Sequence, residues 1–202
     1  MHQDLQKYIF VPLDLPVIKF DRQQFCDYYD QNKIPFATVS NDYDRHNNWF
    51  ALYARKEKKW NQELCELFPD FLSVLKNLPF INTTICILEQ FNPVLPHKDS
   101  NRAWEGHLGP SSFRYPIIID EPERTFYFLK DNEPNVEIYP TWPPNHSRWF
   151  SMNQHISLHG SHMPSSGKRK LMLCVWGFIN KPAMIELISH SIDKYKDYCI
   201  CV

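Results

Sequence analysis

The feature that most constrains the fold is a series of short strand-like segments in the second half of the chain. From residue 83 onward, β-branched, aromatic and other apolar residues gather in short runs. Turn-forming pairs such as Glu121-Pro122 and Pro143-Pro144 separate these runs. The predicted strands cover residues 84–91, 115–119, 125–129, 136–139, 149–152 and 170–178. Many short strands at this spacing are typical of a β-sandwich or jelly roll.

The segments on either side of this region carry helical patterns. Asp21 followed by Gln24 resembles a capping box, and Phe25, Tyr28 and Tyr29 share one helical face. Helices are predicted at 21–31, 60–68, 70–77 and 182–198, after an extended edge segment at 1–20. We therefore expect a mainly β fold with flanking α-helices in a single domain, 1–202. Its parts would be N-terminal helices and edge strands (1–82), a β core (83–180) and a C-terminal helix (181–202).

Composition narrows the function classes. The 202 residues are 43% hydrophobic and carry a formal net charge of -1, so no overall positive field favours nucleic acid. The charged run at 55–59 is interpreted as a solvated face, and 41–48 as a polar loop. Six scattered cysteines without a CxxC pair indicate reduced thiols, and no signal or membrane-spanning pattern is visible. These observations predict a soluble cytoplasmic protein whose partner is not a membrane.

A candidate metal motif follows the first predicted core strand. His97 and Asp99 are two positions apart, so on an extended chain both side chains leave the same face and can close on one ion. Two imidazoles and one carboxylate leave open positions on the metal, as in non-haem Fe(II) oxygenases. The second imidazole has to come from elsewhere in the chain, and His159 is the candidate.

The order of these residues resembles a known family. Leu78-Pro79, a strand, Pro96-His97-x-Asp99, an arginine on the next strand, and His159 with Arg169 ten residues later are similar to Fe(II)/2-oxoglutarate-dependent oxygenases. Within them, the aspartyl/asparaginyl β-hydroxylase and proline hydroxylase branch is the most similar. The resemblance covers roughly residues 70–180 and implies a double-stranded β-helix, a cupin-like jelly roll.

The resemblance also implies roles for individual residues. His97, Asp99 and His159 would bind Fe(II), and Arg169 would bind the distal carboxylate of the co-substrate 2-oxoglutarate through its planar guanidinium. Arg114 would lie near the co-substrate or an acidic group of the substrate. The implied reaction is a dioxygenase reaction with O2 that hydroxylates an unactivated C–H bond and releases succinate and CO2. The implied substrate is an amino-acid side chain, either free as a small molecule or within a peptide.

Several alternatives stay open at the sequence level. His107 begins the sequence His107-Leu108-Gly109-Pro110, seven residues before Arg114, and could replace His97 as the metal ligand. The spacing to Arg169 selects His159 over its neighbours His146, His155 and His162. With His97 as ligand, residues 100–112 become a loop over the pocket.

Two other functions compete with the oxygenase. A non-catalytic jelly roll that binds a metal or another ligand would not need Arg169. A nucleic-acid oxygenase would need a basic groove, which the even charge distribution does not indicate. The sequence does not predict an oligomeric state.

Overall fold

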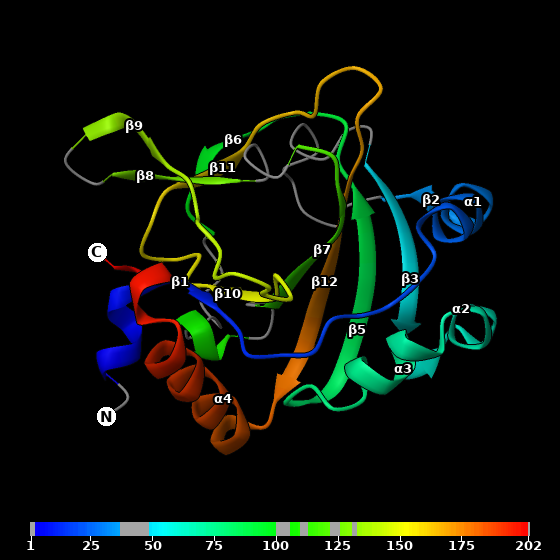
Figure 1. Cartoon of the computed structure of the whole chain (residues 1–202), viewed down its shortest axis with the longest axis horizontal. Helices are drawn as coiled ribbons and strands as arrows, with labels where there is room; N and C mark the ends of the chain where they lie inside the picture. The colour runs from blue at the N-terminus through cyan, green and yellow to red at the C-terminus, as the bar shows by residue number, and fades with distance from the viewer. Residues whose placement is uncertain are drawn as a thin grey trace.

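The fold was analysed in a computed structural model, which describes residues 3–36, 49–99, 106–109, 113–121, 126–130 and 133–201. The described strands form two antiparallel sheets (Figure 1). The larger sheet has the order β13-β1-β10-β7-β12-β5-β3-β2, with β4 paired to β3, and the smaller has the order β6-β11-β8-β9.

The larger sheet consists of β1 (Tyr8–Pro12), β2 (Ile34–Pro35), β3 (Phe50–Lys56), β4 (Lys59–Trp60), β5 (Phe80–Glu89), β7 (Phe113–Ile119), β10 (Phe150–Met152), β12 (Lys170–Ile179) and β13 (Ile200–Cys201). The smaller sheet consists of β6 (Val94–His97), β8 (Tyr127–Lys130), β9 (Glu133–Ile138) and β11 (His159–Ser161). The helices are α1 (Arg22–Asn32), α2 (Gln62–Leu67), α3 (Pro69–Leu75) and α4 (Lys181–Lys194). Short 3-10 turns are η1 (Gln3–Lys7), η3 (Gly106–Leu108) and η5 (Lys196–Tyr198).

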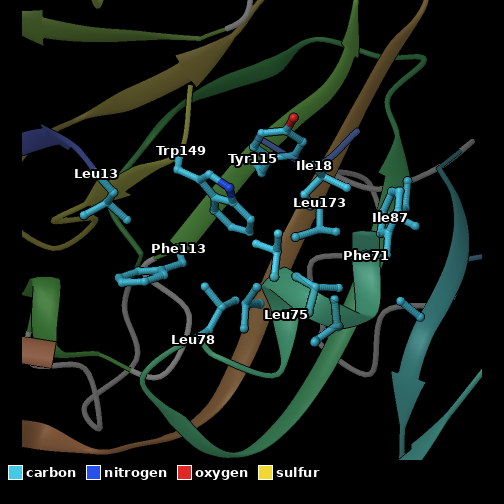
Figure 2. Close-up of a cluster of buried hydrophobic side chains, with 14 of the residues drawn as sticks. Leu13, Ile18, Phe71, Leu75, Leu78, Ile87, Phe113, Tyr115, Trp149 and Leu173 are labelled. Carbon is cyan, nitrogen blue, oxygen red and sulfur yellow. The ribbon is translucent and has the colours of Figure 1, made fainter. Parts of the chain in front are cut away.

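The main hydrophobic core lies between one face of the larger sheet and the flanking helices. Figure 2 shows Phe71 and Leu75 of α3 beside Leu173 of β12 and Ile87 of β5, and all four are buried. A side chain fixes the N-terminus of α1, where Asp21 accepts a hydrogen bond from Gln24 N at 2.8 Å. Through the contacts of this core the flanking helices cover one face of the larger sheet, which we call its outer face.

A second apolar cluster lies between the two sheets. Phe10 of β1 and Phe150 of β10 come from the larger sheet, and Phe128 of β8 comes from the smaller one. Met172 of β12 packs against the same cluster from the larger sheet. We call the face of each sheet that points to this cluster the inner face.

Alternation along β12 assigns its side chains to the two faces. Leu171 and Leu173 lie in the core under the helices, whereas Met172 lies on the inner face. Lys170 is in phase with Met172, and its Nζ contacts Ser161 Oγ of the smaller sheet. Arg169, one position earlier, therefore leaves the chain on the opposite side, towards α1.

Most predicted elements are present, with differences that have local causes. The charged run at 55–59 forms a tight β3–β4 hairpin in which Glu57 and Lys58 have φ values of 51° and 68°, rather than only a solvated face. Residues 94–97, where no strand was predicted, form the edge strand β6. The last helix ends at Lys194 rather than at residue 198, with a 3-10 turn after it. The predicted polar loop at 41–48 lies outside the described residues. Among the described helices, none is long and apolar enough to cross a membrane.

Candidate metal centre

Two short strands of the smaller sheet bring the predicted imidazoles together. His97 of β6 is the direct cross-strand partner of His159 of β11, and their ring centroids are 4.5 Å apart. Asp99 follows β6 by two residues, and its Oδ1 lies 3.1 Å from His97 Nε2. Residues separated by more than sixty positions thus form one cluster because β6 and β11 pair.

Both imidazoles are oriented by the backbone. His97 Nδ1 lies 2.8 Å from Leu95 O, and His159 Nδ1 lies 3.3 Å from Ser157 O. A carbonyl oxygen only accepts, so each Nδ1 is the donor in these contacts, and Nε2 of each ring is the nitrogen that can bind a metal once it carries no proton. This arrangement of a ring N–H on an outer acceptor is typical of histidines that bind metals through the other nitrogen.

The geometry of the donor set fits a single cation. One ligand atom from each of His97, Asp99 and His159 lies within 4.8 Å of the others. Two ligands about 2.1 Å from an ion and at right angles to each other are about 3 Å apart, close to the spacing of His97 Nε2 and Asp99 Oδ1. Two neutral nitrogens and one carboxylate on one side leave the other coordination positions open.

The electrostatics favour the metal-binding protonation states. Burial lowers the pKa of His159 to about 4, partly opposed by the Asp99 charge, so this ring is neutral near pH 7. Burial alone would raise the pKa of Asp99, but its hydrogen bond with His97 and the positive charges of His97 and Arg114 nearby lower it below its usual range. A neutral imidazole and an ionised carboxylate are the forms that bind a cation.

Arg114 lies near this cluster and is linked to it through a buried glutamine. Gln154, oriented so that both ends of its amide are hydrogen-bonded, donates from Nε2 to Asp99 Oδ2 and accepts at Oε1 from Arg114 Nη2 at 2.9 Å. The Arg114 guanidinium also lies over the Trp176 ring, 6.0 Å from its centroid. No sequence pattern pointed to Gln154, because its contacts are formed only by the tertiary fold.

Arg169 is not brought to the cluster. Its guanidinium makes a bidentate ion pair with Asp30 of α1, at 2.8 and 2.9 Å, and its Nε donates to Glu89 Oε1 at 2.8 Å. Burial would lower its pKa, but the hydrogen bonds to Asp30 and Glu89 raise it. These contacts fasten α1 to the sheet and do not support the predicted role in binding a co-substrate.

Lys170, rather than Arg169, lies on the inner face of β12. It is 5% exposed, and burial lowers the pKa of its amine to about 7. Its Nζ contacts Ser161 Oγ, which in turn donates to Gln90 Oε1 at 2.8 Å. Ser161 is two positions after His159 in β11, so Lys170 meets the same face of the strand from which His159 reaches the cluster.

The other histidines have different positions. His107 is fully buried, with Nδ1 2.8 Å from Ser151 Oγ and Nε2 2.8 Å from Tyr8 O, so both of its nitrogens bind protein groups away from the cluster. His155 Nδ1 lies 2.8 Å from Asp99 O. His162 pairs with Glu137, and His146 with Leu13 O. The alternative with His107 as ligand is not supported by these contacts. Of the expected loop at 100–112, residues 100–105 and 110–112 lie outside the described residues.

Comparison with known proteins gives a likeness of fold. No protein-family profile matches the chain, and no curated protein sequence matches it. A solved prolyl hydroxylase from Trichoplax adhaerens, in complex with a hypoxia inducible factor oxygen degradation domain peptide fragment, is similar with a TM-score of 0.51 and 11% identity, over 92% of this chain and 90% of that one. A prolyl-4-hydroxylase from Pseudomonas putida gives a TM-score of 0.48 and 12% identity, over 88% and 96%.

Identities this low show the fold alone, and the fold assignment rests on the Trichoplax structure. The two facing antiparallel sheets with flanking helices, together with that likeness, confirm the predicted double-stranded β-helix. The chain is therefore a mainly β protein with a double-stranded β-helix, and its described residues include one His-Asp-His cluster that could hold a metal.

Proposed function

We propose that this protein is an Fe(II)/2-oxoglutarate-dependent dioxygenase. The observation that carries the proposal is the His97, Asp99 and His159 cluster, with both Nδ1 atoms on backbone carbonyls and a buried lysine on the same inner face. A facial set of two imidazoles and one carboxylate is the pattern of non-haem Fe(II) oxygenases. When bound, the iron would supply O2 activation coupled to decarboxylation of 2-oxoglutarate and oxidation of a C–H bond.

Each ligand has a distinct task. His97 and His159 would bind the metal through Nε2, because each Nδ1 is directed to a carbonyl oxygen. Asp99 would bind through Oδ1, the oxygen that lies next to His97. Fixing both rings before the metal arrives lowers the cost of assembling the site.

Lys170, rather than Arg169, would bind the distal carboxylate of 2-oxoglutarate. The inner-face positions of His159 and Ser161 are about 7 Å apart along the strand, which is close to the length of a five-carbon diacid. An ammonium group with its charge destabilised by burial gains most from an arriving carboxylate. Arg169 is held by Asp30 and Glu89 on the other side of β12.

Arg114 would recognise an acidic group of the substrate or the co-substrate near the metal. It is half-buried, and its Nη2 reaches Gln154 beside Asp99. A planar guanidinium binds a carboxylate through two parallel hydrogen bonds. By the resemblance of its motif, the substrate would be an amino-acid side chain, free or peptidyl, and the product a hydroxylated one.

The test is succinate formation from 2-oxoglutarate under air. Purified protein is supplied with Fe(II) and screened against free amino acids and peptides, alongside the variants His97→Ala, Lys170→Met and Arg169→Met. Loss of turnover in His97→Ala and Lys170→Met, with turnover kept in Arg169→Met, is the expected result. Succinate formation that is unaffected by His97→Ala would overturn the assignment of the metal ligands.

The same experiment distinguishes an oxygenase from a jelly roll that only binds a metal. A protein that binds Fe(II) at His97 and His159 but forms no succinate with any substrate tested would be a non-catalytic metal-binding jelly roll. Turnover lost in Arg169→Met and kept in Lys170→Met would restore Arg169 as the co-substrate ligand.

A further inference from the structure

We infer that Gln154 is a positioning residue that fixes Asp99 as a one-oxygen metal ligand and links it to Arg114. The inference rests on the proposed function, because it concerns the same metal centre. It adds a residue that lies outside the His97-x-Asp99 motif and that the sequence did not single out.

The loop after β10 holds Asp99 at three separate points. Asp99 N donates to Gln154 O at 3.0 Å, and Asp99 O lies 2.8 Å from His155 Nδ1. The third contact is the bond from Gln154 Nε2 to Asp99 Oδ2. Two consecutive residues of one loop thus determine the backbone position of Asp99 and the rotation of its carboxylate.

The contact at Oδ2 decides which oxygen faces the metal. A carboxylate can bind a cation through one oxygen or through both. Because Oδ2 accepts the hydrogen bond from Gln154, only Oδ1 is directed to the side where His97 Nε2 lies, 3.1 Å away. A metal bound through one carboxylate oxygen keeps one more position open than a metal bound through two.

Arg114 sets the direction of the amide. Its Nη2 donates to Gln154 Oε1, so the amide NH2 group must point the other way, to Asp99. A group that binds Arg114 therefore acts on the same hydrogen-bond chain that orients the metal carboxylate. This gives the site a physical connection between Arg114 and Asp99 that does not pass through the metal.

The position of Gln154 is itself fixed by the fold. Gln154 is 2% exposed, and its neighbour Asn153 donates from its backbone N to Ile9 O of β1 at 2.9 Å. β10, which precedes it, pairs with β7 so that Phe150 lies opposite Arg114. Arg114 and the loop that carries Gln154 are thus held by adjacent strands of the larger sheet.

The experiment measures Co(II) binding to the metal-free protein in the absence of any substrate. Gln154→Met keeps the size of the side chain and removes both hydrogen bonds, and Gln154→Asn keeps the amide but shortens its reach. Gln62→Met, on the exposed face of α2, is the matched control. Affinity is measured by competition with a chelator, coordination by the visible spectrum of the bound Co(II), and folding by circular dichroism and thermal unfolding.

Both Gln154 variants are expected to bind Co(II) about 10 to 100 times more weakly than wild type, with an altered spectrum and a smaller rise in Tm on adding Co(II). A folded Gln154 variant with wild-type affinity and spectrum would overturn the inference, and the Asn variant serves if the Met variant does not fold. A role in stability alone would lower Tm equally with and without Co(II). Wild-type protein that fails to bind Co(II), or binds it equally well after His97→Ala, would instead refute the proposed metal centre.

Discussion

Replacing Lys170 with methionine should make the protein more stable while removing its co-substrate binding. The amine of Lys170 is buried between the sheets, 5% exposed, and burial lowers its pKa from 10.5 to about 7. A charged lysine is therefore costly in the folded protein and costs nothing extra in the unfolded chain. Methionine has a similar length and carries no charge.

The size of the effect follows from the two pKa values. The difference between 10.5 and about 7, at about 1.4 kcal/mol per pH unit, gives about 5 kcal/mol as an upper limit for the cost below pH 7. Loss of the contact with Ser161 lowers the stability gained by the variant by about 1 kcal/mol. We expect Lys170→Met to raise the free energy of unfolding at pH 7 by about 2 to 4 kcal/mol, or the Tm by on the order of 10 °C.

The difference in stability between Lys170→Met and wild type should decrease as the pH rises. Between pH 7 and 10.5 the unfolded chain keeps the Lys170 proton and the folded protein releases it, so wild-type stability from this group rises with pH. The advantage of Lys170→Met is therefore largest at pH 7 and below, and shrinks as the pH approaches 10.5.

Urea unfolding of wild type and Lys170→Met at pH 7 and at pH 9.5 measures both effects, because other titrating groups cancel in the difference between the two proteins. The reasoning would be refuted by a variant that is less stable than wild type at pH 7, with a difference that does not change at pH 9.5.

The remaining predictions concern neighbouring residues. Arg169→Met should lower the free energy of unfolding by about 2 kcal/mol in urea titrations, because buried Glu89 would lose one of its two cationic partners among the described residues and keep Lys33. An unchanged stability would show that these ion pairs contribute nothing. Gly160→Ala should weaken Co(II) binding and destabilise the fold by about 1 to 3 kcal/mol. The new Cβ would lie 2.5 Å from Tyr127 Oη and 2.8 Å from Val94 O, between β6 and β11. A Co(II) affinity equal to that of wild type would contradict this prediction. His107→Ala should lower Tm, because two buried hydrogen bonds are lost, but should leave Co(II) affinity unchanged. Loss of Co(II) binding in a folded His107→Ala variant would instead show that His107 is a metal ligand.

The sequence predicted the core strands and the first helix because their signals are local. Asp21 and Gln24 indicated the start of α1, and the structure shows that capping bond. The short strands β6 and β11 were not predicted, because their pairing joins residues far apart and leaves little trace in a stretch such as His159-Gly160-Ser161. The hairpin at Glu57-Lys58 lacks the glycine or asparagine that normally marks such a turn.

At the candidate site, the spacing predicted the three residues that the structure brings into one cluster, but it did not show which face of β12 Arg169 and Lys170 occupy. β12 is buried on both faces, with apolar residues at every position from Leu171 to Val175, so no alternation shows which face Arg169 or Lys170 occupies. A one-residue change of phase exchanges the two faces. The contacts of Gln154 depend on three strands and a loop, and no pattern of residues in the sequence predicts them.

The measurement that tests the central claim most directly is an anaerobic titration of the Fe(II)-loaded protein with 2-oxoglutarate, followed by visible absorption. A co-substrate bound to the iron through its 2-oxo and carboxylate groups gives a charge-transfer band that needs both components. We predict that this band appears in wild type and in Arg169→Met, and is absent in His97→Ala and, at the same 2-oxoglutarate concentration, in Lys170→Met. No band in wild type, or a band that survives His97→Ala, would contradict the account.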